Sequence, residues 1–476
     1  MDHSTKFCVI GAGASGLAVA KNFKLHAIPF DCLEREADLG GLWNIATKSG
    51  VVYETTHLVS AATSTWFDDY PMDEATCLAY PSHAQILDYF RGFVRHFELA
   101  PHIAFGCSVQ HVAPRADTLW DVTIAGESRP RVYRGVVLAN GHHHVPRMPS
   151  YPGRFAGEIL HSSAYRSPRQ LRDKRILVVG AGNSACDIAR DAAHSSGSIV
   201  TMSFRRGYWF IPKFLLGFPT HDVVTTIETL PMPNIVRRII FEVSLWVLQG
   251  PPSRYRLPDP DHHIDQAHPT MSDDIPRLAA HGRIQVKPEI ERYDGANVVF
   301  KDGTSTAFDT VIFATGYKIE FPFIDSALVN NGEGRPLFFK HAFHPAFDTL
   351  FAAGLVQANG SIWRLADYQG RLMARFIHAL DKAPASAAWF RRLKAAPPAA
   401  KAHHFVGSER HTLEANYFVY RRQLKRLTRG FGWSLARLER KVPRPVYGPP
   451  KPWWDWRARK PAPVVVQSGT PPIAAE

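Results

Sequence analysis

The sequence contains two glycine-rich motifs of a kind that binds diphosphates. The first, GAGASG, occupies residues 11–16, between the apolar run Lys6–Ile10 and a helical stretch. In such a turn the first glycine permits the bend, the second lets the backbone approach a pyrophosphate, and the third lets helix and strand pack closely. Glu34 ends the next apolar run, where a carboxylate can accept hydrogen bonds from both ribose hydroxyls. These features predict a dinucleotide site; the alternative is a glycine-rich turn in an unrelated α/β protein.

The second motif, GAGNSA at residues 180–185, has Ala185 at its third position, a variant that the fingerprint allows. The strand expected after it, 199–204, is followed by Arg205 and Arg206 rather than by an acid. An acid would repel a 2′-phosphate, whereas arginines pair with it through charged, bidentate hydrogen bonds. The second site therefore favours NADPH over NADH, the alternative being that both arginines form a solvated basic edge.

A chain with two dinucleotide sites is expected to pass electrons between a bound flavin and a diffusible nicotinamide. Disulfide reductases of this kind use a local pair of cysteines. The five cysteines here are widely scattered, at Cys8, Cys32, Cys77, Cys107 and Cys186. Their spacing excludes a local redox pair or zinc knuckle, and we expect reduced thiols.

The segment between the two motifs carries a resemblance to a known family. FAGEILHSSAY at residues 155–165 matches FxGxxxHxxx(Y/F), the pattern that identifies flavin-containing monooxygenases. The resemblance extends over residues 5–440 and includes an ExxxxxGGxW segment (34–43), FxD(F/Y)P (67–71), ATGY (314–317), and two stretches similar to a bacterial branch, 137–149 and 256–270. Baeyer–Villiger monooxygenases have Trp-Pro where this chain has Tyr165-Arg166, which favours the first family.

The resemblance implies a reaction cycle. NADPH reduces FAD, NADP⁺ stays bound, and dioxygen adds at the flavin C4a to give a hydroperoxide that transfers one oxygen to a small, apolar N- or S-nucleophile. The flavin supplies the chemistry, so the protein must position both cofactors and exclude water. The alternatives are Baeyer–Villiger-type ketone oxidation, an uncoupled NADPH oxidase and, more remotely, a non-catalytic dinucleotide-binding scaffold.

The motifs and the resemblance together give the expected site residues. Those for FAD are Gly11, Gly13, Ala14, Ser15, Gly16, Glu34, Arg35, Gly41, Leu42, Trp43 and Val109, the last through its backbone. Those for NADP are Gly180, Gly182, Asn183, Ser184, Arg205 and Arg206.

The chain departs from the family pattern in one place. Many family members carry an asparagine shortly before FxD(F/Y)P, where it supports the hydroperoxide. Counting back from Phe67 leads here to Val59-Ser60. Ser60 is therefore the candidate catalytic residue, and its weaker hydrogen bond would let more NADPH end as hydrogen peroxide.

These residues require two sheets to position them. Alternation of strand and helix around each glycine motif predicts an α/β fold with two Rossmann-like dinucleotide-binding domains. We expect an FAD domain from residues 1–168 and 314–440 and an inserted NADPH domain at 169–313, with the active site between them. A helical insertion is expected at about 212–270 and a Pro-rich C-terminal tail at 441–476. Residues 297–313 are typical of strand, Asp-Gly turn, strand.

The composition limits the remaining classes. The 476 residues suffice for two or three domains. The net charge of +13 is spread along the chain, and we attribute it to the phosphates of the cofactors and a solvated surface rather than to nucleic acid. Charges interrupt the longest apolar run, Ile235–Leu248. It predicts a buried or interface-lying amphipathic helix, with membrane contact the less favoured alternative.

Location and partners follow from what the sequence lacks. No secretory signal precedes the first motif, so a cytoplasmic location is expected. The partners are then a small-molecule substrate and O2, with a homodimer left open. Consecutive histidines at 142–144 cannot easily converge on one ion, so we expect no metal.

Overall fold

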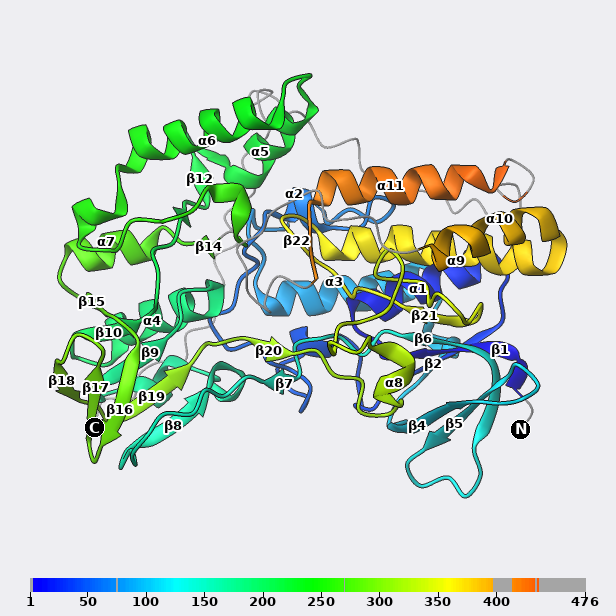
Figure 1. Ribbon diagram of the computed structural model, residues 1–476, viewed down its shortest axis with the longest axis horizontal. Helices are drawn as coiled ribbons and strands as arrows, with labels where there is room; N and C mark the ends of the chain where they lie inside the picture. The colour runs from blue at the N-terminus through cyan, green and yellow to red at the C-terminus, as the bar shows by residue number, and fades with distance from the viewer. Residues whose placement is uncertain (1–2, 74–75, 269, 397–412, 433–434, 436–476) are drawn as a thin grey trace.

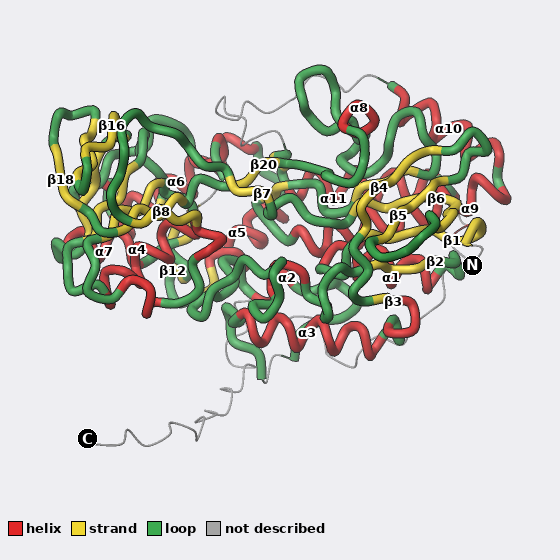
Figure 2. The backbone as a smooth tube through the Cα atoms, turned by 90° about the horizontal axis from the view of Figure 1, so that it is seen from below, coloured by secondary structure: helices red, strands yellow, loops and turns green. Residues whose placement is uncertain are grey.

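The computed structural model describes residues 3–73, 76–268, 270–396, 413–432 and 435. The chain forms two lobes, each built on a sheet of its own, with β7 and β20 running between them (Figures 1 and 2). The tail expected at 441–476 lies outside the described residues.

The first sheet has the order β3-β2-β1-β6-β5-β4, with β21 beside β6. Its strands are β1 (His3–Ile10), β2 (Phe30–Leu33), β3 (Ile103–Ala104), β4 (Val109–Pro114), β5 (Trp120–Ile124), β6 (Arg131–Leu138) and β21 (Leu350–Ala352). The pairs β1–β2, β2–β3, β1–β6 and β6–β21 are parallel, whereas β4, β5 and β6 form an antiparallel extension. The doubly wound α/β class expected from the sequence is confirmed.

Both faces of the first sheet are buried. Along β1, Phe7 and Val9 pack among the helices, while Cys8 and Ile10 pack under β4 and β5, as the alternation of a strand requires. The helices of this lobe are α1 (Ala14–Leu25), α2 (Ala62–Thr65), α3 (His83–His96), α8 (Ser326–Val329), α9 (Ile362–Lys382), α10 (Pro384–Ala395) and α11 (Tyr417–Gly430).

A buried ion cluster joins α1 to α9. The ammonium of Lys21, fully buried, lies 2.6 Å from Asp69 and 2.5 Å from Asp367. Asp69 is the acid of the FDDYP segment, and its neighbour Asp68 lies 3.2 Å from Arg364 on α9. The FxD(F/Y)P motif therefore locks the glycine-motif helix onto the C-terminal half of the lobe.

The second sheet is wholly parallel, in the order β15-β10-β9-β19-β8. Its strands are β8 (Glu158–His161), β9 (Ile176–Val179), β10 (Val200–Ser203), β15 (Ile284–Lys287) and β19 (Thr310–Phe313). Helices α4 (Asn183–Ser195) and α7 (Asp274–Ala280) pack on one face, and β16 (Ile290–Asp294), β17 (Asn297–Phe300) and β18 (Ser305–Ala307) on the other.

The structure differs in one respect from the hairpin that the sequence predicts at 297–313. The partner of β17 is the short strand β18, whereas Thr310–Phe313 leaves the hairpin and pairs with β9 and β8. Four consecutive buried residues in β19 explain this choice, because such a run suits the centre of a parallel sheet rather than a hairpin edge.

The insertion combines short strands and helices. Its elements are β11 (Phe210–Ile211), β12 (Phe214–Leu215), β13 (Phe218–Pro219), α5 (Thr220–Thr229), α6 (Asn234–Gln249), η5 (Pro252–Tyr255), η6 (Ile264–Gln266) and β14 (Thr270–Met271). The remaining short elements are η1 (Gly41–Trp43), η2 (Ala100–His102), β7 (Val145–Pro146), η3 (Ser162–Ala164), η4 (Pro168–Leu171), β20 (Tyr317–Lys318), β22 (Gln357–Ala358) and β23 (Glu414–Ala415). Among the described residues, none of the helices combines the length and apolarity that crossing a bilayer would need.

Candidate active site

The first glycine turn fits a diphosphate at the N-terminus of α1. Gly11 has a φ of +107°, and a Cβ there would lie 2.7 Å from the carbonyl oxygen of Ala139. A Cβ on Gly16 would lie 1.8 Å from the carbonyl oxygen of Gly11, so only glycine is accommodated. Helix α1 has neither a side-chain cap nor an acid in its first turn. Its N-terminus therefore offers the donors and partial positive charge that an anion needs.

Glu34 lies beside this turn and is buried. One oxygen of its carboxylate accepts a 2.7 Å hydrogen bond from the Ala12 N–H and the other a 3.0 Å bond from the Glu36 N–H. The Cys107 N–H donates to the Glu34 carbonyl at 2.8 Å, which brings the start of β4, and so Val109, to the same edge. This is the edge at which the ribose of a dinucleotide bound at the turn would meet a carboxylate.

The other residues expected for FAD gather near this turn. Gly41, with a φ of +55°, approaches so closely that its Cβ would lie 3.1 Å from the Cα of Gly13. Leu42 and Trp43 follow in η1, and the Trp43 ring meets Trp363 edge-on with centroids 6.2 Å apart.

Ala14 and Ser15 open α1, and the Ser15 side chain abuts Gly354, where a Cβ would lie 2.0 Å from the Ser15 Oγ. Arg35 lies farther out, donating to the Ser49 hydroxyl at 2.8 Å. The turn, Glu34 and the 41–43 segment thus form one surface that fits a dinucleotide.

The second glycine turn repeats this geometry. Gly180 has a φ of +121°, and a Cβ there would lie 2.6 Å from the carbonyl oxygen of Ala314 but 3.8 Å from the Cβ of Ala185. That ordinary contact explains why alanine is tolerated at the third position. Gly182 precedes α4, whose N-terminus has no side-chain cap. The Asn183 side-chain oxygen accepts from the Met271 N–H at 2.8 Å, and Ser184 is exposed.

A basic cavity of about 500 Å³ lies at the end of β10. It contains the predicted Arg205 and Arg206 together with two cations that sequence reasoning missed, Arg256 and Lys287. The Arg205 side chain is 79% exposed, whereas Arg206 is held 2.7 Å from Asp261. Lys287 ends β15, the parallel neighbour of β10, and this adjacency was the signal that could have found it. Four cations at the edge of a nucleotide-binding sheet fit a phosphate dianion.

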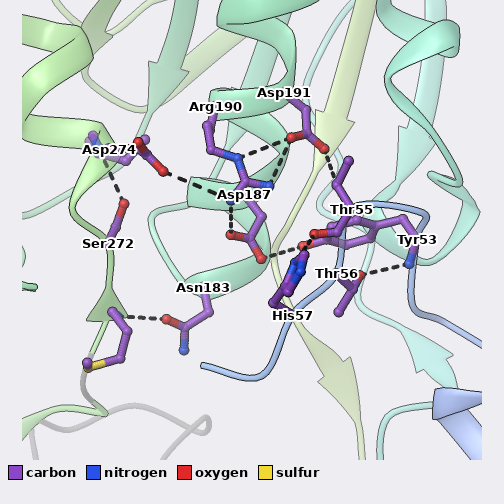
Figure 3. A network of polar contacts seen from close by, with 12 residues as sticks. Tyr53, Thr55, Thr56, His57, Asn183, Asp187, Arg190, Asp191, Ser272 and Asp274 are labelled. Carbon is purple, nitrogen blue, oxygen red and sulfur yellow. Dashed lines mark hydrogen bonds and ion pairs between the residues drawn. The ribbon is translucent and has the colours of Figure 1, made fainter. Parts of the chain in front are cut away.

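A polar network joins the first lobe to α4 (Figure 3). The Tyr53 phenol donates to Asp187 at 2.8 Å, and the Tyr165 phenol donates to Asp191 at 2.9 Å. Thr55 donates to the same Asp191 carboxylate, which also lies 2.9 Å from Arg190. Burial raises the pKa of Asp187, which Arg190 and the Tyr53 hydrogen bond partly offset.

His161 of the 155–165 segment is structural in its contacts. Its Nε2 lies 3.0 Å from the carbonyl oxygen of Gly316 in the ATGY segment, and its Nδ1 lies 2.9 Å from the Ser163 hydroxyl. Burial lowers the pKa of His161, and the bond to Gly316 opposes that shift. The histidine and tyrosine of the identifying pattern thus tie the linker to the ATGY segment after β19 and to α4, respectively.

Ser60 lies away from both glycine turns in sequence but beside the insertion. Its hydroxyl is 2.6 Å from the Thr65 hydroxyl, and the neighbouring Val59 packs against a small apolar cluster of Ile211, Leu245 and Met271. The Ser60 hydroxyl therefore shares its hydrogen-bonding capacity with Thr65.

A pocket of about 170 Å³ adjoins this region. Its walls come from α5, α6, the β14 region and the C-terminal half of the first lobe, and include His221, Phe241, Met271, Asn359 and Glu414. Met271, through its bond to Asn183, connects the pocket to the second glycine turn.

Two polar residues of the pocket lining, His221 and Glu414, have His268 as a neighbour. The Glu414 side chain is 3% exposed, and its carboxylate lies 3.2 Å from the His268 Nδ1 without hydrogen-bond alignment. The His221 Nδ1 has no hydrogen-bond partner among the described residues. Burial, and secondarily His268, lowers the pKa of His221 to about 4.

No metal centre is formed by the side chains of the described residues. These residues contain no group of three or more His, Cys, Asp or Glu side chains placed to hold an ion. Burial, then the adjacent His143, lowers the pKa of His142.

Comparison with known proteins identifies the family. A family model described as flavin-binding monooxygenase-like matches residues 4–434. Dimethylaniline monooxygenase [N-oxide-forming] 2 of Rattus norvegicus is 31% identical over 405 residues, which cover 80% of this chain and 74% of that protein. Flavin-containing monooxygenase 5 of Mus musculus is 30% identical over 447 residues, covering 87% and 80%.

Solved structures agree in fold. S-allyl-L-cysteine S-oxygenase from Allium sativum has a TM-score of 0.60 at 20% identity, covering 91% of this chain and 92% of that chain. The flavin-containing monooxygenase from Stenotrophomonas maltophilia has a TM-score of 0.59 at 21% identity, covering 80% and 100%. With both glycine turns in place, the chain belongs to the flavin-binding monooxygenase-like family and is an FAD-dependent enzyme that uses NADPH and O2.

Proposed function

We propose that the chain oxygenates a small, mainly apolar nucleophile, an amine or a sulfide, in the pocket behind α6. The observation that carries this is the position of the pocket between the two lobes. Met271 in its wall bonds to Asn183 of the second turn, and Asn359 and Glu414 come from the first lobe. Pockets at domain interfaces are the usual place for substrates.

The composition of the pocket supports this substrate class. Ile211, Val224, Ile227, Phe241, Ile264 and Met271 give it apolar walls. The Arg237 guanidinium lies 3.1 Å from Glu228, and Arg238 lies 3.8 Å from Asp265, so these charges compensate one another. In the described part of the chain, the basic side chain paired with the Glu414 carboxylate is His268, at 3.2 Å. A substrate nitrogen or other polar head group would be held at Glu414 while the apolar walls hold the remainder.

The cofactor residues are assigned on the same basis. FAD would lie along the first glycine turn with Glu34 on a ribose, and NADPH along the second turn with its 2′-phosphate in the basic cavity. Bound FAD would supply the redox chemistry between NADPH and dioxygen. The chain's own residues orient the two nucleotides and exclude water from the space between them.

We further propose a domain division that follows hydrogen bonding. Strand β8 pairs with β19, and Phe155 and Tyr151 pack in the core under the second sheet. The NADPH-binding part would therefore begin near residue 151 rather than at 169, and end at 313. The five free cysteines favour a reducing compartment such as the cytoplasm.

Oxygen uptake tests the proposed function. The purified holoenzyme with NADPH would be assayed against tertiary amines, thioethers and cyclic ketones, with product and peroxide measured together. An N- or S-oxide formed in step with NADPH consumption is the expected result. Lactone formation from ketones would instead establish Baeyer–Villiger oxidation, and peroxide equal to NADPH with every substrate would establish an oxidase.

Ser60 is proposed to support oxygen transfer through its hydroxyl. Because that hydroxyl is shared with Thr65, its support is weak. Ser60→Asn should lower the ratio of peroxide to NADPH, and Ser60→Ala should raise it. An unchanged ratio in both variants would remove Ser60 from the site.

A further inference from the structure

The charged side chains of helix α6 face the rest of the protein. The Arg237 side chain donates to Glu228 and to the carbonyl oxygen of Leu230, and Arg238 faces Asp265. The Glu242 carboxylate accepts from the Ile264 N–H at 3.0 Å. All three charged residues of the helix are therefore engaged with the protein, the reverse of an ordinary surface helix.

The outward side of α6 is apolar. Half of the large hydrophobic side chains that are exposed in the described part of the chain lie on this single helix. They are Ile235, Val236, Ile239, Ile240, Val243, Trp246, Val247 and Leu248, which we call the α6 face, with Trp246 62% and Val247 68% exposed. Elsewhere exposed apolar residues need no explanation, but a contiguous stripe of this kind marks an interaction surface.

The place of α6 makes this face accessible. The helix lies at the outer margin of the molecule, above α5 and α7 (Figure 1). Its 16 residues are too few to span a bilayer. They suffice for a helix that lies in the plane of a membrane surface.

Charge distinguishes the two candidate occupants. A second copy of the chain would bring together two molecules of net charge +13. The α6 face carries no acid to offset that repulsion, because Glu242 is turned inward. An anionic lipid surface attracts the same charge, and the exposed Arg254 just after α6 adds to that attraction.

We infer that the α6 face docks the enzyme on an anionic lipid surface. The opposite side of the same helix, through Asn234, Arg237, Arg238 and Phe241, lines the 170 Å³ pocket. Docking would thus place the pocket one helix away from the membrane, where apolar compounds concentrate. The benefit of bringing the pocket close to the membrane rests on the proposed function, whereas docking itself does not.

Vesicle sedimentation of the full-length holoenzyme tests the inference. Vesicles of phosphatidylcholine alone would be compared with vesicles containing phosphatidylglycerol. The test variant is Val243→Glu with Val247→Glu, and the matched control is Leu78→Glu with Ile199→Glu, which are 54% and 56% exposed but lie off α6. Retained FAD absorbance and unchanged NADPH oxidation without vesicles would show that each variant is folded.

The inference expects the wild type and the control to bind vesicles containing phosphatidylglycerol, and the α6 variant to bind them roughly tenfold or more weakly. Equal binding by the α6 variant, or equal binding to phosphatidylcholine alone, would overturn it. Light scattering tests the alternative, in which a second copy of the chain covers the α6 face. A wild-type dimer that the α6 substitutions convert to a monomer, without vesicle binding, would show that a second copy covers the face. None of these measurements requires turnover, so they stand apart from the proposed oxygenation.

Discussion

The phenol of Tyr165 donates a 2.9 Å hydrogen bond to the buried carboxylate of Asp191 on α4. Tyr165 closes the segment that identifies the family, and α4 begins at the second glycine turn. Asp191 also accepts from Thr55 of the first lobe. One carboxylate thus holds the linker, the first lobe and α4 together, which would fix how nucleotides bound at the two glycine turns face each other.

This relationship predicts a graded loss of stability. Tyr165→Phe removes one donor while Thr55 and Arg190 remain, and should lower the free energy of unfolding by about 1 kcal/mol. Asp191→Ala leaves the Tyr165 and Thr55 hydroxyls without their acceptor and removes the shortest ion pair of Arg190, which keeps Asp187 at 3.4 Å, and should cost about 3 kcal/mol. Urea unfolding would measure both.

Tyr293→Phe is the matched control for Tyr165→Phe. The Tyr293 hydroxyl is buried and has no hydrogen-bond partner among the described residues, so its removal should be neutral or stabilising. If the two tyrosine variants lost equal stability, the bond to Asp191 would not be what holds the linker.

The first glycine turn predicts which variant loses flavin. A Cβ at position 16 would lie 1.8 Å from the Gly11 carbonyl oxygen, so Gly16→Ala must push the helix away from the strand. The purified variant should carry little FAD, measured by its absorbance per protein. Gly332→Ala, where a Cβ meets nothing within 4 Å and φ is not positive, should retain full occupancy. Normal flavin content in Gly16→Ala would exclude this turn as the FAD site.

Local patterns explain why much of this structure could be predicted. Both glycine motifs and Glu34 follow from strand–turn–helix sequence within a few residues, and two sheets with parallel strands were expected, although the antiparallel extension β4–β5–β6 of the first sheet was not. The sequence motif FDDYP could be recognised, but its partner Lys21 lies 48 residues away, across the lobe. That pairing depends on tertiary packing, which no local spacing encodes.

The elements that the sequence did not reveal depend on contacts between distant segments. Arg256 joins Arg205 because the insertion folds over the end of β10, and Lys287 joins it because β15 pairs with β10. The orientation of α6 was equally hidden, because its apolar and charged positions are compatible with either side facing inward. The ion pairs of Arg237 with Glu228 and of Arg238 with Asp265 turn the charged side of α6 inward.

The basic cavity predicts the cofactor preference. Arg205→Ala should raise the KM for NADPH by roughly 10–100-fold, since a charge-assisted hydrogen bond contributes about 1.5–3 kcal/mol. Arg256→Ala should act in the same direction, and neither should change the KM for NADH. Arg292→Ala, an exposed arginine outside the cavity, is the control. If the substitutions raised the KM for NADPH and for NADH equally, these arginines would not contact the 2′-phosphate.

The partly buried His221 predicts that the stability of the chain is sensitive to acid. Its pKa in the folded chain is about 4, against 6.5 ordinarily. Between these values the unfolded chain binds a proton that the folded chain does not, so the free energy of unfolding should fall as the pH drops from 6.5 to 4. Above pH 6.5 this contribution is fully present.

His221→Gln should remove the contribution of one proton to the pH dependence of the free energy of unfolding. The slope of unfolding free energy against pH should decrease by about 1.4 kcal/mol per pH unit within the window. The remaining slope comes from other histidines whose pKa burial lowers, such as His161 and His344. His281→Gln, at an exposed position, should leave the slope unchanged. Urea unfolding at intervals of pH measures it, and equal slopes for both variants would mean that His221 is already protonated or solvated in the folded pocket.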